Sequence, residues 1–218
     1  AVVVAAGAVA AVGVSGVLAP PPEQPAARAT LSPAPSPTPT PTPSPTPTTV
    51  GAPADATAYD LGGLPAVDVF AVNATLPVDD DPLASTTGLV AQPREAGAPV
   101  FAEEGGAPVA QLPHAQTYGG TTVPVIEKHD HWVRVLLAGR QGVPGQGDPA
   151  QLTGWLRAAD VDVTPNPQRV EVDLSDRTIR IVTTEGSAES ERIVATDFAS
   201  GTAATPTPLG RSFVMFTD

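Results

Sequence analysis

Short runs of alternating apolar and polar residues, separated by turn signals, dominate residues 98–164. The runs APVFAE, GAPVAQL, TTVPVIEK and HWVRVLLAG are bounded by Gly, Pro or polar residues, and LTGWLRAADVDV follows the loop GQGDPAQ. Several short strands at this spacing are typical of a small barrel or sandwich. We therefore predict a mainly β chain with a small barrel over residues 98–164, little helix, and Trp132 and Trp155 near the core.

A second alternating pattern begins after this region, in residues 168–218. In RVEVDLS the apolar Val170, Val172 and Leu174 alternate with carboxylates, which is the pattern of a half-buried strand. TIRIVTT and SERIVAT follow the turns SDR and EGS and are predicted as two further strands, and the run SFVMF as another. Because the chain stops directly after that run, we expect residues 168–218 to be the first part of an incomplete domain.

The first nineteen residues, AVVVAAGAVAAVGVSGVLA, contain no charged side chain. As a helix they would span about 28 Å, close to the roughly 30 Å hydrocarbon core of a bilayer. Three prolines follow directly and would end such a helix. We expect residues 1–19 to be a membrane anchor or uncleaved signal; the alternatives are a cleaved signal and a buried helix of a soluble domain.

Residues 20–49 are rich in Pro, Thr and Ser, with Pro at every second position in PAPSPTPTPTPSPTPTT. Proline fixes its own φ and disfavours the helical region for the residue before it, so polyproline II is the expected state. We interpret the segment as a disordered but stiff linker that lifts a domain off a membrane. A plain disordered tail and a docking ligand for another protein remain alternatives.

Residues 50–97 are predicted to be an acidic extended segment. Its apolar run at residues 67–72 indicates either a short strand or an extended stretch lying on the following domain. The tripeptide NAT at residues 73–75 matches a glycosylation sequon. The run DDDP lacks the Gly and Glu spacing of a calcium loop, so we interpret it as a solvated acidic turn.

Charge and composition exclude several functions. The formal net charge of −12 disfavours binding to a phosphate backbone, so we expect no nucleic-acid partner. The absence of Cys excludes disulfides, thiolate metal sites and a Cys nucleophile within these residues. His129 and His131 could face one side of a strand as two metal ligands, but they occupy a predicted turn and His114 is the only other His. We therefore expect no metal and no cofactor.

The order of the strands in residues 98–164 resembles a bacterial SH3-like domain. That family begins with a PVFAE-GG-PVA-L pattern, continues to a W-RV-L strand and closes with GW. The matching residues are Val100, Phe101, Gly105, Gly106, Val109, Leu112, Trp132, Val133, Val135, Gly154 and Trp155. The resemblance implies a small barrel that accompanies a cell-wall enzyme and positions it.

Residues 168–218 resemble the opening of an L,D-transpeptidase catalytic domain, with V-VDLS-RT--IV followed by SG and then by TP-G-F-V. The matching residues are Val172, Asp173, Leu174, Ser175, Arg177, Thr178, Ile181, Ser200, Gly201, Thr207, Pro208, Gly210, Phe213 and Val214. The order of anchor, linker, SH3-like domain and this domain is similar to that of actinobacterial envelope enzymes of the family. An all-β domain with a chance TPLG loop is the alternative interpretation.

The resemblance implies a transferase that cross-links peptidoglycan stem peptides through a Cys thioester. In the family the catalytic Cys and His lie late in the domain, and no residue of this sequence matches them, so we assign no catalytic residue and expect this chain to be inactive alone. The implied location is the cell envelope, with an extracytoplasmic domain anchored in the membrane. A non-catalytic wall-binding module on a stalk and a glycan-bearing structural surface protein are the rival hypotheses.

Overall fold

The computed structural model describes residues 50–142 and 150–215, and this part of the chain is mainly β. Two short 3-10 helices, η1 (Leu61–Gly63) and η2 (Ala158–Asp160), are its helical elements. The predicted anchor and linker, residues 1–19 and 20–49, lie outside the described residues. Within the described residues no helix is both long and apolar enough to cross a membrane.

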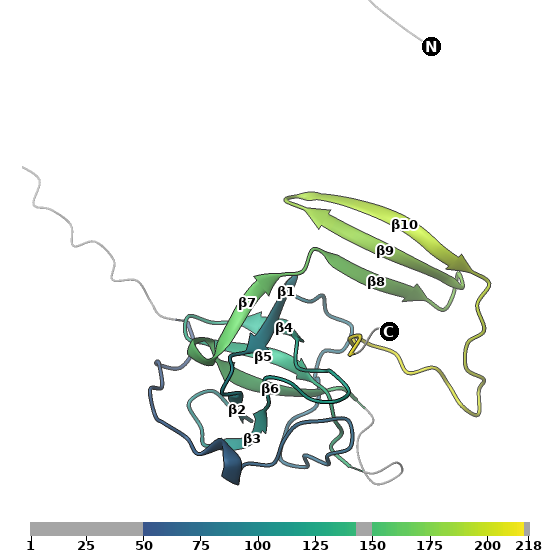
Figure 1. Cartoon of the computed structure of the whole chain (residues 1–218). Helices are drawn as coiled ribbons and strands as arrows, with labels where there is room; N and C mark the ends of the chain where they lie inside the picture. Colours follow the sequence, from purple (N-terminus) through teal and green to yellow (C-terminus); the bar gives the residue numbers. More distant parts are fainter. Residues whose placement is uncertain (1–49, 143–149, 216–218) are drawn as a thin grey trace, which may run out of the picture. The chain divides into compact units, whose positions relative to one another are not determined.

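A curled sheet of seven strands, ordered β3-β2-β6-β5-β4-β1-β7, makes up most of the described chain (Figure 1). Its strands are β1 (Leu89–Pro93), β2 (Ala98–Phe101), β3 (Pro108–Leu112), β4 (Val123–Lys128), β5 (Trp132–Leu137), β6 (Leu152–Arg157) and β7 (Val161–Pro165). All of the pairings between these strands are antiparallel. The predicted strands between residues 98 and 164 are thus confirmed, and the sheet also takes in β1, which precedes that range.

The core of this sheet consists of aliphatic side chains from every strand. Val100, Val125 and Val135 are fully buried, and so is Trp132, whose ring packs edge to face on Phe101 at 5.0 Å between centroids. The indole nitrogen of Trp132 donates to Pro53 O at 3.0 Å, which satisfies its one polar group. The prediction for Trp132 is confirmed, whereas Trp155 is only half-buried.

Residues 50–88 run across this sheet as an extended segment, which is the second of the two predicted alternatives. Isolated parallel bridges join Ala66 to Gln111 and Val72 to Arg140. Val67 and Leu76 are buried and belong to the same core cluster as the sheet. The segment therefore contributes side chains to the core of the sheet, and its bridges to the sheet fix its position.

A separate antiparallel sheet contains β8 (Gln168–Asp173), β9 (Thr178–Glu185) and β10 (Ala188–Thr196), in the order β10-β9-β8. These are the three strands predicted from RVEVDLS, TIRIVTT and SERIVAT. The register pairs Val170 with Ile181 and Val172 with Ile179, so these four apolar residues share one face. Val170 and Val172 are 58% and 52% exposed, so this face is more open than the half-buried strand we predicted.

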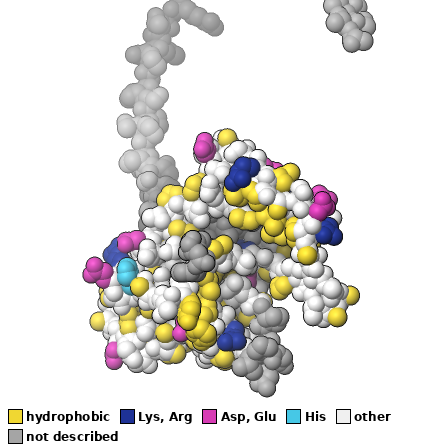
Figure 2. Space-filling model, turned by 45° about the vertical axis from the view of Figure 1, so that its right-hand side comes forward, with side chains coloured by type: hydrophobic (Ala, Val, Ile, Leu, Met, Phe, Trp, Pro, Cys, Tyr) yellow, Lys and Arg dark blue, Asp and Glu magenta, His cyan; other side chains and the backbone are white. Residues whose placement is uncertain are grey.

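Charged side chains occupy the opposite face of the small sheet. Arg169 pairs with Glu171 and Glu189 at 2.8 Å, and Arg180 pairs with Glu171 at 2.8 Å. These hydrogen bonds, first that from Arg169, lower the pKa of the Glu171 carboxyl. Figure 2 shows hydrophobic side chains gathered on the surface of this part of the chain, with charged groups near them.

The prediction of a strand at SFVMF is wrong for the described residues, because residues 211–215 form no strand. Instead this stretch is fixed by contacts with the first sheet and its extended segment. Phe213 packs against the buried core cluster, and Gly120 N donates to Met215 O at 3.2 Å. The apolar residues of this stretch pack on a neighbouring surface. The sequence pattern alone cannot distinguish such a segment from a strand.

Candidate functional site

The residues that resemble the L,D-transpeptidase opening begin at the end of β8 and in the turn to β9. Asp173 Oδ1 accepts hydrogen bonds from Ser175 Oγ at 2.6 Å and from the Ser175 and Asp176 amides at 2.8 and 3.1 Å. The Ser175 hydroxyl is the main cause that lowers the pKa of the Asp173 carboxyl. This is a side chain closing its own turn, a structural role that Asp performs often.

Arg177 connects this turn to the end of β10. Its backbone has a positive φ of 54°, and its guanidinium donates to Phe198 O at 2.6 Å and Asp197 O at 3.2 Å. The Asp197 amide returns a hydrogen bond to Arg177 O at 2.9 Å. The turn and the chain that leaves the small sheet are therefore fixed to each other.

The late Thr-Pro stretch has specific hydrogen bonds within its own loop. Gly201 N donates to Thr207 Oγ1 at 2.7 Å, and Thr202 and Thr205 exchange backbone hydrogen bonds at 3.1 Å. A Cβ on Gly201 would lie 2.3 Å from Thr205 O, so this position excludes any side chain. The SG and TP parts of the motif thus form one compact loop.

Arg211, directly after this loop, forms a buried ion pair with Asp79 of the extended segment. Its Nε and Nη2 donate to the two carboxylate oxygens at 2.7 Å each, and Nη1 donates to Ala84 O and Ser85 O at 3.3 and 3.2 Å. The Asp79 side chain is fully buried and that of Arg211 is 12% exposed. The hydrogen bond from Arg211 to the carboxylate raises the pKa of its guanidinium. We call this pair, together with the hydrogen bond from Arg211 N to Pro82 O at 2.7 Å, the clamp.

The clamp corrects our interpretation of DDDP as a solvated acidic turn. Asp79 is buried, and Asp80 accepts a hydrogen bond from Arg134 Nη2 at 2.8 Å, which is the main cause that lowers the pKa of Asp80. Two of the three carboxylates therefore have arginine partners from other parts of the chain. Sequence spacing could not reveal these partners, because they lie 132 and 54 residues away.

The histidines of HDH do not come together. His129 is half-buried, stacks near Trp155 at 5.0 Å between centroids, and lies between Glu104 and Glu127, with Nε2 2.9 Å from Glu127 Oε1. His131 is exposed. In the described residues no group of three or more His, Cys, Asp or Glu side chains is placed to hold a metal ion.

The sequon at residues 73–75 is not on the surface. Asn73 is 4% exposed. Its main-chain N–H donates to Arg140 O at 2.9 Å, and its side-chain oxygen is buried. A glycan on Asn73 would have to displace the packed core, so the folded domain excludes modification at this position.

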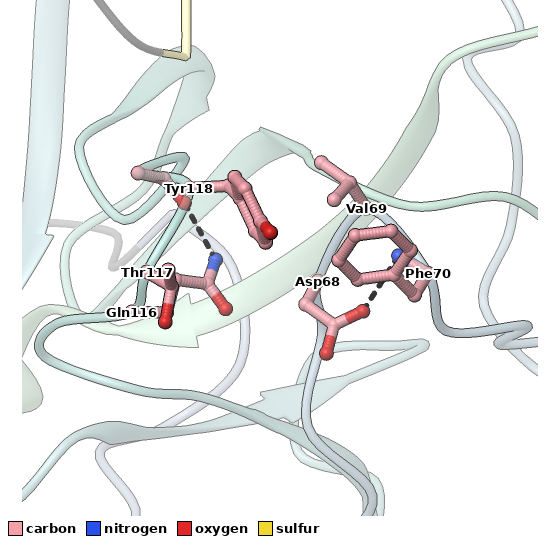
Figure 3. A pocket seen from close by; sticks show the side chains of 7 residues that line it. Asp68, Val69, Phe70, Gln116, Thr117 and Tyr118 are labelled. Atoms are coloured by element: carbon pink, nitrogen blue, oxygen red, sulfur yellow. Dashed lines mark hydrogen bonds between the residues drawn. The ribbon is translucent and has the colours of Figure 1, made fainter.

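A small pocket, which sequence reasoning missed, lies between residues 68–70 of the extended segment and residues 116–119 of the β3–β4 loop (Figure 3). Its volume is about 160 Å³. The rings of Phe70 and Tyr118 meet edge to face at 5.3 Å, and the two residues are 64% and 55% exposed. We call this the Phe70–Tyr118 pocket. Its only sequence signal is the presence of two aromatic residues, Phe70 and Tyr118, in a chain with few aromatics.

No family model matches the chain, and no curated protein and no solved structure gives a significant match to it. The geometry described above and the sequence motifs are therefore the basis for assigning a function.

Proposed function

We propose that this chain is the anchored N-terminal portion of an L,D-transpeptidase that cross-links peptidoglycan in the cell envelope. In this proposal the seven-stranded sheet is an SH3-like domain that positions the enzyme on the wall. The small sheet and the loop after it are the opening of the catalytic domain. Stem peptides of peptidoglycan are the substrates, and residues 1–19 attach the protein to the membrane.

The observation that carries the proposal is the fixed loop that joins the SG and TP parts of the late motif. Gly201 N donates to Thr207 Oγ1, and Arg211 then forms the clamp with Asp79. A disordered Pro-Thr linker of the kind proposed for residues 20–49 would not require such contacts. The earlier motif residues lie in β8, in β9 and in the turn between these two strands.

The chemistry of the proposed reaction needs a nucleophile that this chain lacks. A thiolate would attack the carbonyl carbon of a peptide bond in the donor stem, and the D-amino acid would leave as an amine. An amine of the acceptor stem would then attack the thioester, forming the cross-link and returning the thiol. The 218 residues contain no Cys, and Met215 is a thioether that cannot act as this nucleophile.

The experiment compares this chain with the whole encoded protein that contains it. Both are incubated with disaccharide-tetrapeptide, and dimers are measured by mass spectrometry. We expect dimers from the whole protein, their loss when its catalytic Cys is replaced by Ala, and none from the 218-residue chain. A whole protein that lacks Cys or forms no dimers, or a 218-residue chain that forms them, would refute the proposal.

The second candidate is a non-catalytic wall-binding module on a stalk. It is favoured by the absence of Cys and by the fact that most of the buried core belongs to the first sheet and its extended segment. It predicts that the chain sediments with insoluble peptidoglycan whether or not the encoded protein forms dimers. The proposed anchor is tested separately: the native protein should stay with the membrane fraction at high salt, and recovery in the soluble fraction would reject it.

A further inference from the structure

We propose that the Phe70–Tyr118 pocket binds a primary ammonium group carried on an aliphatic stem, such as a lysine-type side chain of a peptide. The inference rests on the described geometry of this pocket and not on the transpeptidase proposal. It would stand if that proposal failed.

The aromatic surface of the pocket is open to solvent. Phe70 and Tyr118 are 64% and 55% exposed, although both are large apolar residues that a domain normally buries. They meet at an interplanar angle of 75°, so their ring faces point in different directions around one hollow. An aromatic face attracts a cation through its quadrupole, and aliphatic carbons pack on the same surface.

The carboxylate of Asp68 also lines the pocket, next to Phe70 (Figure 3). Its Oδ1 accepts hydrogen bonds from the Phe70 and Ala71 amides at 2.7 Å each, which fixes the loop and the orientation of the carboxylate. Among the described residues no cationic side chain forms an ion pair with Asp68. Arg140 donates instead to the carbonyl oxygens of Val69 and Phe70, at 3.5 and 3.4 Å. The Asp68 carboxylate therefore has no cationic partner among the described residues and is available to an external cation.

The amide of Gln116 is fixed beside the pocket. Its Nε2 donates to Gly119 O at 2.8 Å with one of its two N–H groups, and its side-chain oxygen is an acceptor. Asp68 and Gln116 thus both carry acceptors that a ligand with several donors can use. An ammonium group has three donors and a positive charge that suits the Asp68 carboxylate, whereas that carboxylate repels an anion.

The alternative ligand is a sugar ring, which also stacks on aromatic side chains and donates from its hydroxyls. A ring stacked on a flat platform suits one open face, whereas these two rings stand nearly perpendicular in a pocket of about 160 Å³. The charge of Asp68 also favours a cation over a neutral hydroxyl. We therefore argue for the ammonium and leave the saccharide as an outcome of the test.

The expected affinity is weak, because the pocket is small and open to water. Exposed cation–π contacts and exposed ion pairs each change affinity by about two- to fivefold. We expect a dissociation constant on the order of 1 mM or weaker, in the range that nuclear magnetic resonance titration measures well.

The experiment titrates the ¹⁵N-labelled 218-residue chain with Nα-acetyl-lysine methylamide and follows amide chemical shifts. Nα-acetyl-norleucine methylamide, which has the stem without the amine, and N-acetylglucosamine are the matched probes. We expect saturable shifts at residues 68–71 and 116–119 with the lysine probe, at least fivefold weaker binding of norleucine, and weaker lysine binding as sodium chloride is raised.

Two variants separate the contributions without unfolding the loop. Asp68→Asn keeps the Oδ1 acceptor for the Phe70 and Ala71 amides but removes the charge, and should weaken lysine binding about three- to fivefold. The double variant F70L/Y118L keeps apolar bulk but removes both ring faces, and should weaken it about tenfold. Glu95→Gln, at another exposed carboxylate, is the control and should change nothing; the spectra report whether each variant stays folded.

Absence of saturable shifts at these residues with the lysine probe would overturn the inference. Equal binding of norleucine would also overturn it, as would lysine binding that survives both the Asp68 and the ring variants. Saturation of the same residues by N-acetylglucosamine but not by the lysine probe would instead identify a saccharide site.

Discussion

Replacing Arg211 by Ala tests whether the clamp holds the late Thr-Pro loop against the first sheet. The substitution removes two charge-assisted hydrogen bonds of 2.7 Å to a carboxylate that is fully buried. If the loop stayed in place, the unpaired buried charge would cost about 3–5 kcal/mol. The loop can avoid that cost by detaching, because water then reaches Asp79.

The size of the effect is set by the free energy with which the Arg211–Asp79 pair holds the loop in place. A hydrogen bond to a charged group contributes about 1.5–3 kcal/mol, and we take this range as the loss because the two bonds share one ion pair. A loss of that size raises the population of the detached loop about 10- to 150-fold. The seven-stranded sheet should remain folded, since its core contains none of the clamp's charged groups.

The assay is hydrogen exchange of the amide of residue 211, which donates to Pro82 O at 2.7 Å and is present in both proteins. Its exchange rate, corrected for the new side chain, should rise by the same 10- to 150-fold if opening is fast relative to exchange. Arg94→Ala is the matched control. It removes a pair with Asp162 whose side chains are 58% and 67% exposed, and should change the exchange rate less than about threefold.

A rise of less than about threefold in Arg211→Ala, or an equal rise in the Arg94 control, would refute this reasoning. A double-mutant cycle of Asp79→Ala and Arg211→Ala isolates the pair from other effects on the loop. It should give a coupling of about 1.5–3 kcal/mol, and a value near zero would mean that the two side chains do not depend on each other.

Two other predictions concern single residues. Gly210→Ala should speed exchange of the residue 211 amide as Arg211→Ala does, because Gly210 has a φ of +112° and an added Cβ would lie 2.8 Å from Pro82 Cβ; unchanged exchange would contradict it. Hydrogen bonds from Thr57, with smaller contributions from Tyr59 and Arg157, lower the pKa of Asp55 to about 2. Since the folded pKa is depressed, Asp55 should stabilise the fold above about pH 4 and lose this contribution as the pH falls toward 2. Asp55→Asn should therefore reduce the change in the free energy of unfolding between about pH 4 and about pH 2. An Asp55 carboxyl that titrates near its ordinary value of about 4 in the folded protein would contradict this prediction.

Local patterns in the sequence predicted most of the strands. TTVPVIEK, HWVRVLLAG and the three runs after residue 168 each became a strand, because alternation and turn residues act over a few positions. β1 was missed, since LVAQP is short and ends in Pro. The SFVMF strand was wrong because the same apolar residues found a packing surface instead of a strand partner.

The sites could not be predicted in the same way. The clamp joins residues 132 apart, and the pocket joins residues about 48 apart in two loops, so no local rule relates their members. The resemblance to L,D-transpeptidases rests on the order of motif residues around TPLG. It gave no reason to expect Arg211 to pair with DDDP, because composition alone cannot show which carboxylates are buried.

The carboxylates of the acidic segment before the first sheet are explained in part by their arginine partners. Asp55 pairs with Arg157, Asp79 with Arg211 and Asp80 with Arg134, so much of the negative charge is used within the fold. Asp68 has no cationic partner among the described residues, and it lines a pocket together with two exposed aromatic residues. The net charge of −12 by itself would attract any cation, and removing any one exposed carboxylate would weaken this attraction by the same amount. Only a built site distinguishes Asp68→Asn from Glu95→Gln, and this difference separates specific ammonium binding from the general acidity of the chain.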